Sequence, residues 1–74
     1  MKNIEIQDSF LAQARRSRCG VVVFLMNGFQ MRGVITAFDP FVVVLLTENK
    51  QQMIYKHAIS TIVANHAIDL TPDT

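Results

Sequence analysis

Residues 21–38 read VVVFLMNGFQMRGVITAF, a pattern that predicts two β-strands joined by a tight turn. The first strand, Val21–Met26, is continuously apolar, as in strands that are covered on both faces. Asn27-Gly28 is the strongest short signal for a hairpin turn. The second strand, Phe29–Phe38, contains Gly33 in its middle, which predicts a sharp bend of the kind that small barrels require.

Turn residues separate three more predicted strands on the C-terminal side of these two. Asp39-Pro40 ends the second strand, because proline has no backbone N–H to donate. A tight connection at Lys56–Ala58 precedes the last strand, and we expect a frayed tail from about Asn65 onward. The predicted segments are the strands Phe41–Leu46, Gln51–Tyr55 and Ile59–Val63, with a turn at Thr47–Lys50.

A helix is predicted on the N-terminal side, over Gln7–Arg18, because apolar residues recur there at one-face spacing. Asp8 or Ser9 is the predicted N-cap, and Gly20 is the predicted stop. One helix followed by five short strands predicts a mainly β fold, a small five-stranded bent barrel. We expect it to form a single domain that spans residues 1–74.

The composition indicates a folded domain that is small for independent stability. Half of the 74 residues are hydrophobic and 18% are charged, which excludes a disordered tail or linker. Chains this short usually need a disulfide, a metal or a partner chain, and Cys19 alone provides no disulfide framework. The chain is therefore either a homo-oligomer or a marginal monomer. Open edge strands favour the oligomer, because pairing edges between copies covers them and can close a ring.

The apolar runs also bear on the compartment. The longest, Val21–Met26 and Phe41–Leu46, have six residues each, whereas a membrane-spanning helix needs about twenty. The N-terminus has no apolar segment typical of a signal peptide. Together with the single cysteine, Cys19, which we interpret as a packing residue, these features predict a cytoplasmic protein that makes no membrane contact.

Three of the seven basic residues lie together at Arg15, Arg16 and Arg18, although the net charge is only +1. At the end of a helix, cations complement the helix dipole. The cluster is either a solvated helix face or a set of phosphate contacts, each arginine providing about one.

Several segments together resemble Hfq, the family of bacterial Sm-like RNA chaperones. The match covers about residues 6 to 63. It is carried by Gln7-Asp8, Phe10-Leu11, Asn27–Gly33, Phe38-Asp39 and Tyr55–Thr61. The resemblance implies a helix capping a bent five-stranded sheet, assembled as a homohexameric ring. It also implies single-stranded RNA binding on both faces of the ring and on its outer rim.

On one face, called the proximal face, the resemblance implies a uridine site. Phe41 is the implied stacking ring, and Gln7, Lys56 and His57 are implied to read the base and its 2′-hydroxyl. Such chemistry suits uridine, since aromatic rings stack bases while lysine and histidine donate hydrogen bonds to carbonyl oxygens. The alternative is that His57 is a structural turn residue.

Three residues near this site in the sequence are interpreted differently. Tyr55 and Met53 are expected at the subunit interface. Pro40 stands where the family usually has a polar residue, and proline offers no side-chain donor. We therefore expect weaker uridine binding on the proximal face than is typical of the family.

On the opposite face, called the distal face, the resemblance implies pockets for purine-rich strands. Their implied residues are Phe24, Asn27, Gly28, Phe29, Gln30, Met31, Arg32, Gln52, Ser60 and Thr61. Phe24 and Phe29 supply stacking surface, although both are also plausible core aromatics, and Gln52 with Thr61 suits an adenine edge. Whether this face reads two- or three-nucleotide steps stays open. The implied rim residues are Arg15, Arg16 and Arg18.

The sequence contains no catalytic set, phosphate-binding glycine loop or metal-ligand spacing, so we expect neither an enzyme nor a cofactor or metal. The resemblance implies a chaperone that holds a small regulatory RNA and an mRNA on different faces and promotes their pairing. The alternative is a ring that serves only as a structural or protein-interaction module.

Overall fold

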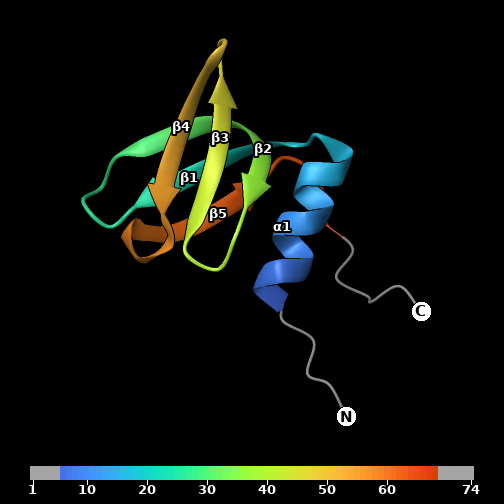
Figure 1. Cartoon of the computed structure of the whole chain (residues 1–74), viewed down its shortest axis with the longest axis horizontal. Helices are drawn as coiled ribbons and strands as arrows, with labels where there is room; N and C mark the ends of the chain where they lie inside the picture. The colour runs from blue at the N-terminus through green and yellow to red at the C-terminus, as the bar shows by residue number, and fades with distance from the viewer. Residues whose placement is uncertain (1–5, 69–74) are drawn as a thin grey trace.

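One α-helix and a five-stranded antiparallel sheet make up residues 6–68, the part of the chain that this computed structural model describes (Figure 1). The elements are α1 (Ile6–Ser17), β1 (Gly20–Leu25), β2 (Gln30–Phe38), β3 (Val42–Thr47), β4 (Lys50–Tyr55), the 3₁₀ turn η1 (Lys56–Ala58) and β5 (Ile59–Ala64). The strands follow the order β4-β3-β2-β1-β5, so β4 and β5 are the edges. This arrangement confirms the predicted mainly β fold with one N-terminal helix.

The helix α1 begins and ends differently from the prediction. Asp8 and Ser9 lie inside it, so neither is its N-cap; Asp8 instead lies in the first turn, where a carboxylate complements the helix dipole. At the other end, Arg18 adopts a left-handed φ of 53°. The N–H groups of Arg18 and Cys19 donate to the carbonyls of Arg15 and Ala14, both at 3.3 Å. This is a Schellman termination with arginine at the left-handed position, and Gly20 begins β1.

The hairpin between β1 and β2 has a three-residue loop, Met26–Gly28. The Leu25 carbonyl accepts from Gly28 N at 3.0 Å, and Leu25 N donates to the Phe29 carbonyl at 2.8 Å. Gly28 has a φ of 94°, which side-chain-bearing residues rarely adopt. The turn lies where Asn27-Gly28 predicts it, but β1 ends one residue earlier and β2 begins one residue later than predicted.

The bend in β2 depends on Gly33. Figure 1 shows β2 curving across the sheet, and Gly33 faces the end of β3. A Cβ placed on Gly33 would overlap the Leu46 carbonyl oxygen and lie 2.6 Å from Thr47 Oγ1. The Thr47 hydroxyl donates to the Arg32 carbonyl, which holds β3 close to the bend.

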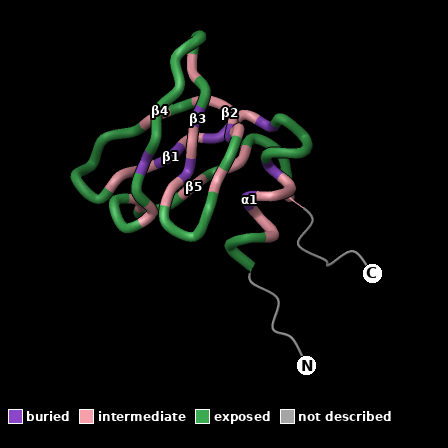
Figure 2. Tube along the Cα trace, in the orientation of Figure 1, coloured by how far each residue is buried: buried purple, intermediate pink, exposed green. Residues whose placement is uncertain are grey.

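The core lies between α1 and the concave side of the sheet (Figure 2). All buried residues of the described chain are apolar or cysteine, and β4 is exposed at every residue except Ile54. The buried set is Leu11, Ala14, Cys19, Val21, Val23, Ile35, Val43, Leu45 and Ile54. No helix among residues 6–68 has the length and apolar character needed to cross a membrane.

The predicted frayed tail is wrong over its first residues. Asn65 N donates to the Gly20 carbonyl at 2.9 Å, and Ile68 packs against the core. These contacts tie the segment after β5 to the junction between α1 and β1. The rest of the predicted tail, residues 69–74, lies outside the described residues.

Candidate nucleic-acid interface

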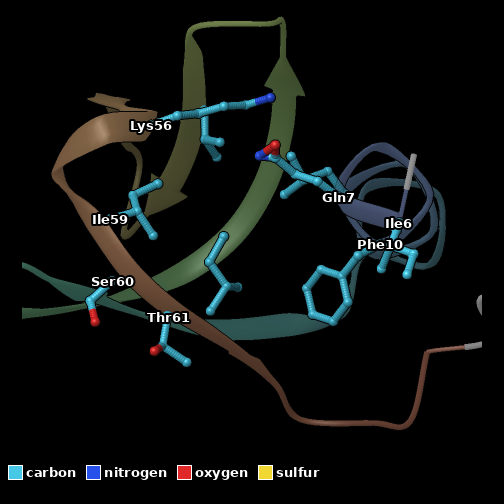
Figure 3. Close-up of a pocket in the computed structure, with 10 residues that line it drawn as sticks. Ile6, Gln7, Phe10, Lys56, Ile59, Ser60 and Thr61 are labelled. Atoms are coloured by element: carbon cyan, nitrogen blue, oxygen red, sulfur yellow. The ribbon is translucent and has the colours of Figure 1, made fainter.

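Three of the four predicted proximal residues converge, although they come from distant parts of the sequence. Gln7 lies in the first turn of α1, Phe41 ends the loop between β2 and β3, and Lys56 begins η1. Lys56 N donates to the Phe41 carbonyl at 2.8 Å. Figure 3 shows the ends of the Gln7 and Lys56 side chains pointing toward one another. His57 follows Lys56 in η1 with an exposed side chain.

The surface around these residues combines cation, amide and aromatic groups. Gln7 and Lys56 line a pocket with Asp8, Asp39 and Pro40. Lys56 Nζ lies 5.7 Å from the centroid of the Phe38 ring. The Phe41 side chain is 67% exposed, so its ring face is available to a planar ligand. A flat aromatic next to donors suits an unstacked base.

Asp39 organises the loop that leads to Phe41. Its Oδ1 accepts from Phe41 N and from Val42 N, each at 2.8 Å. These two hydrogen bonds, aided by the charge of Lys56, hold the pKa of the Asp39 carboxyl below its usual value. The residue is therefore an ionised acceptor at neutral pH.

A larger pocket, of about 380 Å³, lies between α1 and β5 (Figure 3). Gln7 and Lys56 line one end of it, and its walls include Ile6, Phe10 and Ile59. Ser60 and Thr61, which were predicted for the distal face, also line this pocket. The sequence did not predict this pocket. It depends on how α1 lies against the edge strand β5, and no local sequence pattern specifies that packing.

Four predicted distal residues share one face of the sheet. Phe24 of β1 lies between Gln30 of β2 and Thr61 of β5 in the strand register. Directly opposite side chains point to the same face, and Arg32 shares it because it lies two residues from Gln30. The Phe24 side chain is partly buried, whereas Gln30, Arg32 and Thr61 are exposed.

The other predicted distal residues lie elsewhere. Asn27, Gly28 and Phe29 lie at or next to the β1–β2 turn, and Phe29 is 68% exposed. Met31 points to the core side of β2. Gln52 lies in β4, at the opposite edge of the sheet from Thr61. One chain therefore does not bring Gln52 and Thr61 together.

The predicted rim arginines do gather at one place. Arg15, Arg16 and Arg18 line a pocket with Val34, Ile35 and Thr36 of β2. All three arginines are exposed. The Schellman termination at Arg18 turns the chain back here, so the cations lie beside residues 34–36 of β2.

In the edge strand β4, the backbone N–H and C=O groups of alternate residues point away from the sheet. Successive residues of an antiparallel strand direct their N–H and C=O groups alternately to either side. Because Lys56 N donates to the Phe41 carbonyl, Tyr55, Met53 and Gln51 direct theirs away from β3. Tyr55 and Met53, the predicted interface residues, are 58% and 59% exposed.

The other edge strand, β5, has the same property. Asn65 N donates to the Gly20 carbonyl, so Ala64 and Ile62 direct their N–H and C=O groups away from β1. The sheet therefore has two different edges, and each offers backbone donors and acceptors to another strand.

Comparisons with known proteins identify a family for this chain. A family model described as "Hfq protein" matches residues 6–69. The chain is 56% identical over 70 residues to "RNA-binding protein Hfq" of Bacillus pumilus (strain SAFR-032), and the alignment covers 95% of this chain and 96% of the relative. It is 54% identical, with the same coverage, to "RNA-binding protein Hfq" of Bacillus subtilis (strain 168).

A solved structure is similar over most of the fold. A 1.55 Å crystal structure of "the pleiotropic translational regulator, Hfq" superposes with a TM-score of 0.78 and 49% sequence identity. The match covers 80% of this chain and 98% of that one. The extent of the family match and the identities over nearly the full length show that this chain belongs to the Hfq family.

Proposed function

We propose that the chain is a non-enzymatic, cytoplasmic RNA chaperone that acts as a homohexameric ring. The ring binds U-rich RNA on its proximal face and purine-rich RNA on its distal face, and it promotes pairing of small regulatory RNAs with mRNAs. The relatives' description as RNA-binding proteins supports RNA as the ligand. The observation that carries the proposal is that Gln7 and Lys56 line one pocket while Lys56 N bonds to the backbone of Phe41, whose ring is exposed.

The two different sheet edges support assembly into a ring. An edge of β4 pairing with an edge of β5 on the next copy is a heterologous contact, which closes when the rotation per copy allows. This pairing also brings Gln52 of one copy toward Thr61 of the next. An adenine site that uses both residues therefore needs two copies, which explains why a single chain separates them.

Ring assembly also accounts for RNA binding by a nearly neutral chain. Each copy adds its own cations and aromatic rings, and repeated weak contacts on one RNA raise the overall affinity. Holding two RNAs on opposite faces raises their effective concentration for pairing. The arginines of the rim then reduce the repulsion between the phosphates of the two strands.

Two matched aromatic variants test the assignment of the faces. Phe41→Ala is expected to weaken oligo(U) binding about tenfold or more, because base–aromatic stacking is worth about 1–3 kcal/mol per base. Phe29→Ala is expected to weaken oligo(A) binding by a similar factor. The two side chains are 67% and 68% exposed, so each variant serves as the other's control for stability.

Titrations of both variants with labelled oligo(U) and oligo(A) at two salt concentrations measure the effect. Each variant is expected to lose affinity for one oligomer and keep the other within about twofold, since opposite faces bind independently. Equal losses for both oligomers in either variant contradict the assignment. A ring that binds neither oligomer contradicts RNA binding itself and favours the structural module.

The arginine cluster is tested by replacing Arg15, Arg16 and Arg18 together with alanine. We expect the triple variant to slow RNA annealing about tenfold or more, because about three phosphate contacts per copy are lost. Oligo(A) binding is expected to change less, since the distal residues are elsewhere on the sheet. Stopped-flow annealing and oligo(A) titration provide the comparison, and equal loss of both activities, or of neither, contradicts a rim role.

A further inference from the structure

The loop between β2 and β3 is held by a side chain where a turn ordinarily uses the backbone. In a β-turn over residues 39–42, the Asp39 carbonyl is the expected acceptor for Val42 N. Here the Asp39 carboxylate accepts from Val42 N and also from Phe41 N, each at 2.8 Å. Asp39 N in turn donates to the Val42 carbonyl at 3.0 Å, which closes the loop. Pro40 fits this loop because its φ is fixed and it has no N–H to satisfy.

These bonds fix the backbone of the residue that carries the exposed ring. Both polar backbone groups of Phe41 are engaged, its N–H by the Asp39 carboxylate and its carbonyl by Lys56 N at 2.8 Å. The Phe41 side chain is 67% exposed, so packing restrains its ring little. The direction in which the ring is presented therefore depends mainly on the loop backbone.

We propose that Asp39 is a positioning residue for base recognition: its carboxylate holds the loop so that Phe41 presents a stacking surface beside Lys56. This proposal rests on the proposed uridine site. It assigns Asp39 no contact with RNA, because a carboxylate facing a polyanion is repelled by the phosphates. Its effect reaches the ligand through the backbone of Phe41.

The charge state of Asp39 fits this role. An ionised carboxylate makes stronger hydrogen bonds to N–H groups than a neutral acceptor does. The lowered pKa of the Asp39 carboxyl follows first from its bonds to Phe41 N and Val42 N, and Lys56 adds to it. Asp39 and Lys56 also line the same pocket, so the carboxylate and the cation face one another beside the loop that carries Phe41.

The test compares Asp39→Ala with Asp39→Asn in the full chain, each with and without Phe41→Ala. The alanine variant removes the acceptor, whereas asparagine retains a side-chain oxygen that can accept the same N–H bonds. We expect Asp39→Ala to weaken oligo(U) binding about as much as Phe41→Ala does, about tenfold, with oligo(A) binding within about twofold. Asp39→Asn is expected to recover most of the affinity. In the Phe41→Ala background, Asp39→Ala is expected to have no further effect.

Titration with oligo(U) and oligo(A), with the particle mass and thermal midpoint of each variant, decides the proposal. Four results overturn it: unchanged oligo(U) binding in Asp39→Ala, additive losses in the double variant, equal losses in the asparagine and alanine variants, or joint loss of oligo(A) binding and ring mass. If the unsubstituted protein itself does not bind oligo(U), the proposed uridine site has failed. If it binds and Asp39→Ala binds equally, only the positioning role has failed.

Discussion

Met53→Pro is expected to convert the ring into single chains. The N–H of Met53 points away from β3, so proline removes a backbone donor from the free edge of β4 while the bonds between β3 and β4 remain. Edge strands tolerate proline at such positions, so each chain is expected to keep its fold. Sedimentation is expected to show particles near 8.4 kDa, the mass of one chain.

RNA binding is expected to fall with the assembly. Repeated sites on one particle raise avidity by about 10² to 10⁴, so loss of the ring is expected to weaken both oligo(U) and oligo(A) binding about a hundredfold or more. Met53→Ala is the matched control, because it removes the same side chain and retains the N–H. Circular dichroism checks that the strands persist. A Met53→Pro protein that still sediments as a ring contradicts pairing through the β4 edge.

Gly33→Val is expected to be the most destabilising single substitution among the turn and bend residues. Any Cβ at this position overlaps the Leu46 carbonyl oxygen, and a backbone atom held in the β2–β3 ladder cannot move away as a flexible side chain can. Overpacking of this kind costs about 1–3 kcal/mol, and the branched valine is expected near the upper end. Loss of the Thr47 bond to the Arg32 carbonyl adds to the cost.

Gly28→Ala provides the comparison, since nothing lies within 4 Å of a Cβ there and only the positive φ opposes it. Its expected cost is about 1 kcal/mol. Urea unfolding at one fixed protein concentration measures both variants, because the stability of an oligomer depends on concentration. A Gly33→Val protein as stable as Gly28→Ala contradicts the close approach of β3 at the bend.

The strands were predictable from sequence because each is a β-branched or aromatic run bounded by turn residues. The first and last residues of the strands were less predictable, because they depend on local hydrogen bonds and on the backbone conformation of the turns. β3 begins at Val42, one residue later than predicted, because the Asp39 carboxylate holds Phe41 in the loop. β4 begins at Lys50 because Glu48 and Asn49 both adopt positive φ and complete the turn in two residues. The C-terminal end of α1 was not predictable either, because Arg18 occupies the left-handed position that glycine usually takes.

The site was predictable in content but not in arrangement. Residue chemistry identifies Lys56 and His57 as suited to a base, and the family resemblance adds Phe41 and Gln7, but neither specifies which loops meet. The strand order decides that Thr61 lies beside Phe24 while Gln52 lies at the far edge. The pocket between α1 and β5 has no sequence signal, because it depends on how the helix lies against the edge strand.

Native mass spectrometry of the unsubstituted protein, alone and with short oligo(U), tests the central claim most directly. That claim is that β4 and β5 edges join copies into a ring whose faces bind RNA. We expect one species at six times the 8.4 kDa chain mass, which keeps this stoichiometry when it binds the oligomer. A lone chain of 8.4 kDa that binds oligo(U) as tightly as any larger species contradicts it.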